Sequence, residues 1–201
     1  MRTTRLAIVA ILFALLPGRS VSGRQARALP HVLVLTDVGD IEIEVDVVHA
    51  PISAGRFLKH VDAGFYTGGR FHRTVKMDNQ PDNEVKIEVI QASLNPNRAN
   101  EAGDPIVLER TNLTGLKHLD GVVSTPRGAP DSARSGFFIC INDQPSLDFG
   151  GKRNPDGQGF AAFGRVVKGM EDVVRKIQRE PNNDAQNLTP PIQILSIKRL
   201  Q

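Results

Sequence analysis

The segment 41–47, IEIEVDV, alternates strictly between apolar and acidic residues. A period of two places successive side chains on opposite faces of a β-strand, so this pattern predicts a strand with one buried and one wet face. The preceding run 31–36, HVLVLT, is separated from it by the turn DVGD. The two segments therefore predict a β-hairpin with Gly39 in its turn.

Two segments have the spacing of helices instead. In 51–64, apolar residues recur at i, i+3, i+4 and i+7, Pro51 suits a first helical turn, and Gly64 suits a stop. The segment 169–178 repeats this pattern. The apolar positions are Ala54, Phe57, Leu58 and Val61 in the first segment, and Met170, Val173, Val174 and Ile177 in the second.

Short apolar runs bounded by Gly and Pro fill the space between these helices and follow the second one. Each run is short enough for a strand, and no internal repeat is visible. The expected strands are RFHRTV (70–75), VKIEVIQ (85–91), PIVLE (105–109), GVVS (121–124), GFFICI (136–141), FAAFGRVV (160–167) and IQILSIKRL (192–200). Many short strands with two isolated helices predict a mainly β protein, a closed barrel capped by helices.

The N-terminus does not fit that domain. Residues 1–5 carry two arginines, 6–16 are an unbroken apolar run, and Pro17 and small residues follow. This order is typical of a secretory signal peptide, and eleven apolar residues are fewer than the about 20 that span a bilayer. We therefore expect a signal peptide in 1–23, with cleavage possible as late as residue 28, a flexible leader in 24–30, and a periplasmic or secreted protein. A buried N-terminal helix is the alternative.

Composition changes this picture little. The chain of 201 residues has 25 Lys and Arg against 22 Asp and Glu, but residues 1–23 hold three of the arginines and no acid. The remaining chain is nearly neutral, so charge gives no argument for nucleic acid or an anionic membrane. The five histidines show no metal-ligand spacing, and Cys140, alone in the apolar run FFICI, is expected to be a buried small hydrophobe. We expect no metal and no cofactor.

Five motifs occur in an order that resembles one family. They are FHR (71–73), IQAS (90–93), GFFICI (136–141), LD (147–148) and FGRVVKGMEDVVRKI (163–177). Their order and spacing are similar to those of cyclophilins, which are peptidyl-prolyl cis-trans isomerases. The resemblance covers residues 31–200 and implies an eight-stranded antiparallel closed barrel capped by two α-helices, in one domain of residues 31–201. It also implies proline-containing polypeptide substrates, no nucleic-acid partner, no membrane anchor and a monomer.

The resemblance implies site residues as well. Arg73 and Gln91 match the family's catalytic arginine and the glutamine that orients it. Rotation about an Xaa-Pro bond breaks amide resonance, a barrier of about 18–20 kcal/mol, and a fixed cation aimed at the proline nitrogen stabilises the twisted amide more than the planar one. The expected substrate-binding residues are Phe138, Val89, Leu147, Phe160, Pro126 and Arg127. Strand alternation predicts that Phe137 points away from Phe138.

Some positions depart from the family pattern. Glu88 and Ser146 stand where bulky side chains are usual, which predicts a pocket with one thin wall, and Gly136 replaces a glutamine. The segment 76–86, KMDNQPDNEVK, lengthens the connection between Arg73 and Gln91 by about ten residues and has turn chemistry. Together with the loop 147–159, this insert is expected either to form a modified wall or lid of the groove, or to be variation away from the site. The thin wall leaves a non-catalytic, proline-binding or partner-binding module as the alternative to an isomerase.

Overall fold

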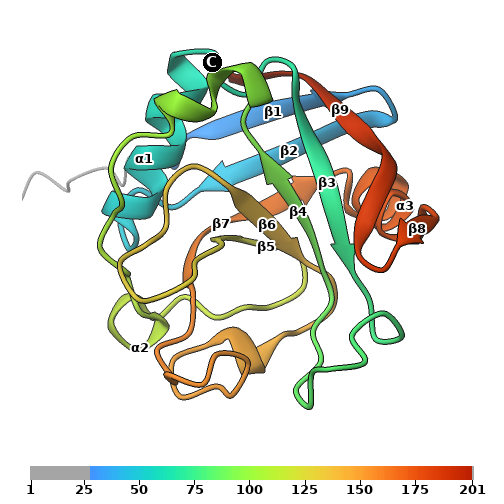
Figure 1. The fold of residues 1–201 in the computed structure, drawn as a ribbon. Coiled ribbons are helices and arrows are strands. Elements are labelled where there is room, and N and C mark those ends of the chain that lie inside the picture. Colours follow the sequence, from blue (N-terminus) through green and yellow to red (C-terminus); the bar gives the residue numbers. More distant parts are fainter. Residues whose placement is uncertain (1–27, 201) are drawn as a thin grey trace, which may run out of the picture.

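The computed structural model describes residues 28–200, and eight of its strands close into an antiparallel barrel (Figure 1). The order around the sheet is β1-β2-β7-β5-β6-β4-β3-β9, and pairing of β1 with β9 completes the ring, as expected. The short strand β8 pairs only with β9. The strands are β1 (His31–Thr36), β2 (Gly39–Val45), β3 (Gly69–Val75), β4 (Val89–Ser93), β5 (Val122–Thr125), β6 (Phe137–Cys140), β7 (Ala161–Lys168), β8 (Asn182–Asp184) and β9 (Asn187–Arg199).

The alternation seen in the sequence fills the barrel. Ile41, Ile43 and Val45 of β2 are fully buried, while the acidic residues between them are not. Gly39 begins β2 with φ of +135°, a conformation that few other residues adopt, and a Cβ there would lie 2.7 Å from the side chain of Val173. The predicted hairpin of β1 and β2 is confirmed.

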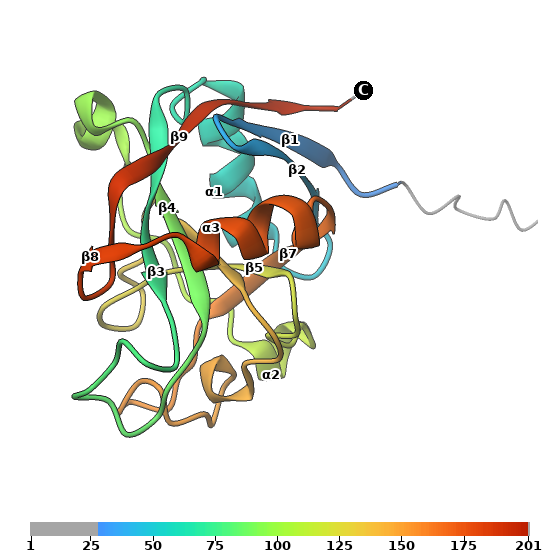
Figure 2. The ribbon, with the colours of Figure 1, turned by 90° about the vertical axis from the view of Figure 1, so that its right-hand side faces the viewer.

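Helices cover two sides of the barrel. The helix α1 (Pro51–Asp62) begins at the expected proline and buries the expected face against the core. The second segment forms one π-helical turn, η3 (Met170–Val174), followed by the short α3 (Arg175–Arg179), with Val173, Val174 and Ile177 buried. Figures 1 and 2 show α1 and α3 on opposite sides of the barrel. Three shorter elements lie in the connections, namely η1 (Pro96–Glu101), α2 (Thr111–Thr114) and η2 (Pro145–Leu147).

Two strand predictions need correction. The segment 105–109 makes a single bridge, from Ile106 to Ala133, and is not a strand of the barrel. Its alternation is real, because Ile106 and Leu108 are buried and Val107 is exposed, but it packs on the core without a partner ladder. The strand predicted at 85–91 begins only at Val89, because the chain before it still belongs to the insert.

The predicted signal peptide, 1–23, lies outside the described residues, as does most of the predicted leader. Of the leader, residues 28–30 are described, and the carbonyl of Pro30 accepts a hydrogen bond from the backbone of Val45 at 2.8 Å. Within residues 28–200, no helix is long and apolar enough to cross a membrane.

Candidate active site

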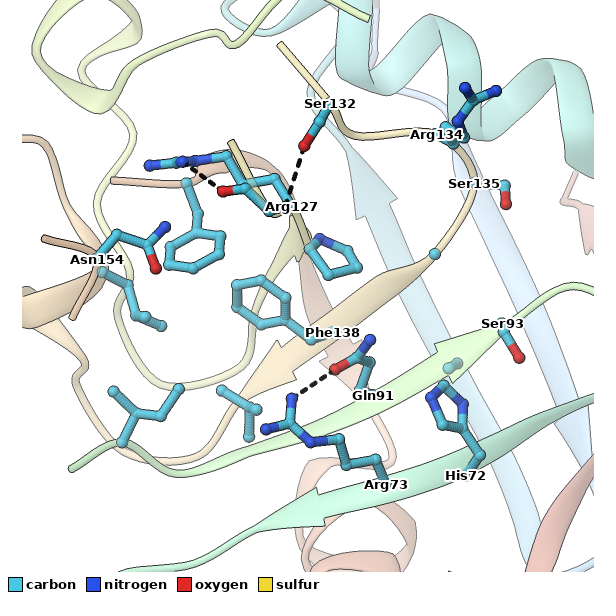
Figure 3. A pocket seen from close by; sticks show the side chains of 18 of the residues that line it. His72, Arg73, Gln91, Ser93, Arg127, Ser132, Arg134, Ser135, Phe138 and Asn154 are labelled. Carbon is cyan, nitrogen blue, oxygen red and sulfur yellow. Dashed lines mark hydrogen bonds between the residues drawn. The ribbon is translucent and has the colours of Figure 1, made fainter. Parts of the chain in front are cut away.

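Three neighbouring strands bring the predicted catalytic residues into one row. Arg73 of β3 pairs with Gln91 of β4, and Gln91 pairs with Phe138 of β6. The ladder of β3 shifts register between Phe71 and Arg73, which is a β-bulge. Phe71 is therefore buried in the barrel, whereas His72 and Arg73 both line a groove on the outside of the sheet. Figure 3 shows Arg73, Gln91 and Phe138 side by side in this groove, whose volume is about 610 Å³.

The guanidinium of Arg73 is held by two side-chain amides. Its Nη1 donates to Oε1 of Gln91 at 2.9 Å, and its Nε donates to Oε1 of Gln186 at 2.9 Å, with Nη2 bonded to the same oxygen. Burial, and then the charge of Arg153, lowers the pKa of Arg73, yet an arginine stays protonated at physiological pH. Both partners are neutral, so the full positive charge remains available to a substrate.

The residue Gln186 was not predicted from the sequence. It lies in the turn between β8 and β9, and its Nε2 donates to the backbone carbonyl of Asn79 at 3.0 Å. Asn79 belongs to the insert and in turn donates from Nδ2 to the carbonyls of Thr74 and Ala185, at 3.0 Å each. The insert thus supports the amide that holds Arg73. No local pattern in the sequence indicates this role, because the contact joins residues that are 113 positions apart.

The floor of the groove is a small apolar cluster separate from the barrel core. Four of the predicted substrate-binding residues belong to it, and the ring of Phe160 meets that of Phe138 edge-on, with centroids 5.6 Å apart. Phe137 points into the barrel core instead, as alternation predicted. The members of the floor cluster are Val75, Ile87, Val89, Phe138, Cys140, Leu147 and Phe160. Burial raises the pKa of the Cys140 thiol, which is consistent with a packing role.

Three polar residues linked by hydrogen bonds, Ser124, His118 and Asp148, lie against this floor on its buried side. The His118 ring lies nearly parallel to the Phe138 ring, with centroids 6.1 Å apart. Its Nδ1 is 2.8 Å from Oδ1 of Asp148, and its Nε2 is 2.9 Å from Oγ of Ser124. Burial works to raise the pKa of Asp148, but hydrogen bonds from His118 outweigh it and hold that pKa below the usual value. The order Ser-His-Asp resembles a hydrolase triad, but Ser124 is fully buried and does not line the groove, so we assign these three residues a structural role.

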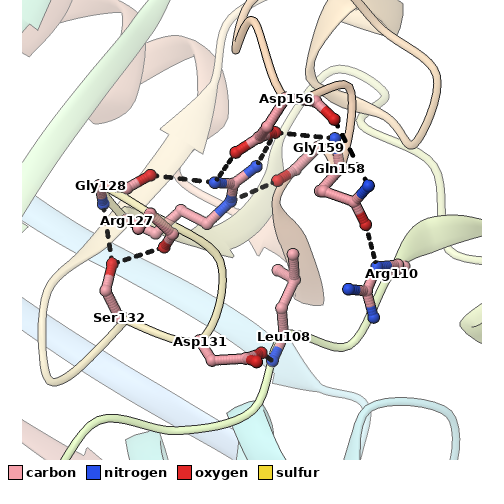
Figure 4. Close-up of polar contacts among 10 residues, drawn as sticks. Leu108, Arg110, Arg127, Gly128, Asp131, Ser132, Asp156, Gln158 and Gly159 are labelled. Carbon is pink, nitrogen blue, oxygen red and sulfur yellow. Dashed lines mark hydrogen bonds and ion pairs between the residues drawn. The ribbon is translucent and has the colours of Figure 1, made fainter.

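The two remaining predicted residues, Pro126 and Arg127, follow β5 and line the groove. The side chain of Arg127 is buried and already has partners, as Figure 4 shows. It forms two hydrogen bonds with the Asp156 carboxylate, at 2.7 and 2.9 Å, and donates from Nε to the carbonyl of Gly159 at 2.6 Å. Arg127 lowers the pKa of Asp156 to about 2, with help from the backbone of Gln158. Its guanidinium therefore anchors the loop 147–159, and it lies over the ring of Phe160, 5.3 Å from the ring centroid.

The two residues on which the prediction of a thin wall was based do not line the groove. Glu88 accepts hydrogen bonds from Asn142 and Gln178 and is not part of the groove lining, and Ser146 is not part of it either. The wall is completed on this side by Ile87 and by two residues of the loop 147–159, Arg153 and Asn154.

The two enlarged loops meet beside the groove. Arg153 donates from Nη1 to the carbonyl of Val85, in the insert, at 2.6 Å. Figures 1 and 2 both place the insert and the loop 147–159 at the same end of the barrel. Of the two expectations for these loops, a modified wall fits the loop 147–159, which lines the groove with Leu147, Arg153 and Asn154. No residue of the insert 76–86 belongs to this lining, and the insert contacts the wall from outside the groove. Residues 28–200 hold no cluster of three His, Cys, Asp or Glu side chains suited to a metal ion.

Comparison with known proteins agrees with this geometry. A family profile described as "Cyclophilin type peptidyl-prolyl cis-trans isomerase/CLD" matches residues 31–199. Peptidyl-prolyl cis-trans isomerase A of Dickeya dadantii is 37% identical over 172 residues, which cover 84% of this chain and 83% of the relative. Peptidyl-prolyl cis-trans isomerase B of Escherichia coli is 35% identical over 145 residues, covering 71% and 80%.

Solved structures agree on the fold. A cyclophilin type peptidyl-prolyl cis-trans isomerase of Cryptosporidium parvum matches with a TM-score of 0.68 at 20% identity, covering 86% of this chain and 98% of that one. The chain belongs to the cyclophilin-type peptidyl-prolyl cis-trans isomerase family.

Proposed function

We propose that this protein accelerates the cis-trans isomerisation of Xaa-Pro bonds in exported polypeptides, with Arg73 as the catalytic residue. The observation that carries the proposal is the row of Arg73, Gln91 and Phe138 across three strands. It places a fixed cation beside an apolar floor on which a proline ring can pack.

In the proposed mechanism no covalent bond is made or broken. The proline ring packs on Phe138, and the free N–H groups of Arg73 face the imide. The planar amide shares its nitrogen lone pair with the carbonyl, but the twisted amide does not, so its nitrogen becomes an acceptor. Arg73 therefore stabilises the transition state more than the ground state, which lowers the barrier. Gln91 orients Arg73 and can donate to the substrate from its amide nitrogen.

This function is favoured over a non-catalytic binding module. That alternative depended on a thin pocket wall, but Glu88 and Ser146 lie outside the groove lining. We propose a monomer as the active form, because the strands of a single barrel are sufficient to bring Arg73, Gln91 and Phe138 together.

One experiment distinguishes an isomerase from a non-catalytic binding module. Isomerisation of a set of Xaa-Pro peptides is measured by NMR exchange spectroscopy, and binding of the same peptides is measured in parallel. An isomerase raises the exchange rate above the uncatalysed rate, and Phe138→Ala weakens both binding and turnover. Binding without any increase in exchange rate would overturn the proposal and leave the module.

The periplasmic or secreted location is also a proposal, supported by the charged, apolar and small-residue pattern at the N-terminus. Sequencing the N-terminus of the protein made in a Gram-negative host tests it. We expect the mature chain to begin between residues 24 and 29, and an intact Met1 terminus on all of the protein would contradict export by cleavage.

A further inference from the structure

Arginine side chains supply the charge of the groove lining, which holds no acid. The lining contains four arginines and one histidine, and no Asp or Glu, although the part of the chain outside 1–23 has equal numbers of acidic and basic residues. The positive charge is therefore a property of the groove and not of the whole protein. The five residues are His72, Arg73, Arg127, Arg134 and Arg153.

These arginines differ in what neutralises them. Arg127 is paired with Asp156. Arg73 is bound only by amides, Arg134 donates to the carbonyl of Gly103, and Arg153 donates to the carbonyl of Val85. Among the described residues, none of these last three has a carboxylate within ion-pair distance.

The side chain of Arg153 is the most instructive of the three. It is half-buried at the wall of the groove, and the bond to Val85 and a backbone bond to the carbonyl of Ser146 fix its place. Its charge reaches Arg73, since it lowers the pKa of that residue. Two like charges facing one partly desolvated groove repel each other, and an anionic group bound between them relieves the repulsion.

We propose that the groove selects proline-containing segments that carry a carboxylate side chain next to the proline, with Arg153 as the specificity-determining residue. The inference rests on the proposed function for the proline itself. The occupant is a polypeptide and not a free anion, because the apolar floor lies next to the cations and offers the proline ring its place. Arg153 acts on binding and not on the twisted amide, which is left to Arg73.

Two peptide series test this proposal. One series, Ala-Ala-Xaa-Pro-Ala-Phe, varies the residue before proline, and the other, Ala-Ala-Ala-Pro-Xaa-Phe, varies the residue after it, with Xaa as Glu, Gln or Lys. Exchange spectroscopy gives kcat/KM, and fluorescence anisotropy of labelled peptides gives Kd independently of turnover. At one of the two positions we expect the Glu peptide to have a higher kcat/KM and a lower Kd than the Gln peptide, each by about fivefold or more at low salt. The Lys peptide should have the lowest kcat/KM and the weakest binding. The Glu/Gln ratio should shrink as salt is raised.

Variants assign the effect to one side chain. In Arg153→Gln the Glu/Gln ratio should fall to about one, both for kcat/KM and for Kd. Arg153→Lys should keep part of the ratio, and Lys152→Gln, which removes the exposed neighbouring cation, should keep all of it.

Each contrary result has a distinct meaning. Equal Kd and kcat/KM for Glu and Gln peptides at both positions would overturn the proposed selectivity and leave the isomerase function intact. A ratio that survives in Arg153→Gln would overturn the assignment to Arg153. Absence of turnover on every peptide would count against the proposed function alone, because the Kd values would still test the preference.

Discussion

Arg73 and Arg127 both line the groove, but the hydrogen-bond partners of their guanidinium groups differ in charge. Arg127 meets a carboxylate, so its charge is used to hold a loop, whereas Arg73 meets the amide oxygens of Gln91 and Gln186. An amide fixes the orientation of a guanidinium without cancelling its charge. Arg73 is therefore both rigid and fully charged, which is what stabilisation of a transient lone pair requires.

Gln186 is a positioning residue, because its side-chain amide holds the guanidinium of Arg73 in place. Replacing it with Ala frees the edge of the Arg73 guanidinium formed by Nε and Nη2. We expect kcat to fall about tenfold, by analogy with loss of orienting groups, while peptide Kd changes little. The urea unfolding midpoint should stay close to that of wild type, since Gln186 is only half-buried.

A matched control for this variant lies on β9, the strand that follows Gln186. Gln193→Ala removes an exposed amide of β9 and should keep wild-type kcat. A Gln186→Ala enzyme with unchanged kcat would show that Gln91 alone is enough to orient Arg73.

Burial of His60 predicts a dependence of stability on pH. Burial, and then the charges of Arg56 and Lys59, lowers the pKa of His60 from 6.5 to about 4. The unfolded chain therefore takes up this proton first, and stability is lost as pH falls from about 6.5 toward 4. Between pH 7 and pH 5 the free energy of unfolding should fall by about 2 kcal/mol through this group.

Urea titrations at the two pH values, on wild type and on His60→Gln, measure this contribution. The variant lacks the titrating group, so its loss between pH 7 and pH 5 should be smaller by about that amount. A variant that loses as much stability as wild type would assign the pH dependence to other groups.

The site residues that the sequence indicated are those that lie in or directly beside the motifs and strands. Arg73, Gln91 and Phe138 belong to motifs, and their row follows from antiparallel register. Gln186 and Arg153 were missed because each acts across a loop, over 113 residues to Arg73 and 68 residues to Val85. No local pattern encodes such contacts. The expected effect of Glu88 was wrong because its partners, Asn142 and Gln178, turn it away from the groove.

At the level of elements, the insert 76–86 is closed at its neck by one side chain. Gln80 is fully buried, and its amide bonds the carbonyls of Lys76 and Ile87 at 2.7 and 2.8 Å and the backbone nitrogen of Ile87 at 3.2 Å. This clamp lets the chain leave β3 and rejoin β4 without separating Arg73 from Gln91. The polar run is thus compatible with an intact strand pair.

Removing the clamp tests its contribution. Gln80→Ala leaves buried backbone groups without partners, and we expect the free energy of unfolding to fall by about 2–3 kcal/mol. Because the insert also supports Gln186, which holds Arg73, we expect kcat to fall as well in Gln80→Ala. Urea unfolding with Glu84→Ala as the exposed control in the same insert measures the effect. A Gln80→Ala protein as stable as the control would mean that the neck is held by other contacts.

Strands were predicted best where the alternation of apolar and polar residues coincided with hydrogen-bonded pairing to a neighbouring strand. β1 and β2 satisfy both conditions. Residues 105–109 satisfy only the first, since their buried and exposed positions alternate along a surface segment with one bridge. The hairpin of β8 and β9 was only partly predicted, because β8 has three residues and no apolar period.

At the scale of the whole molecule, closure of the barrel depends on β9. This strand pairs with β3 on one side and with β1 on the other, so the pairing of β1 with β9 closes the sheet. Periodicity predicts strands but not their neighbours, and closure with eight strands was implied by the resemblance of the motifs to cyclophilins. The closed sheet is the rigid frame that keeps β3, β4 and β6 in register beneath the groove.

The central claim is that Arg73 stabilises the twisted amide more than it stabilises the bound planar one. The most direct test is exchange spectroscopy on a bound Xaa-Pro peptide with wild type and Arg73→Ala, together with peptide Kd for both. The account predicts that kcat falls by about 100-fold or more while Kd changes less than about threefold. An Arg73→Ala protein that isomerises the bound peptide at the wild-type rate would contradict it.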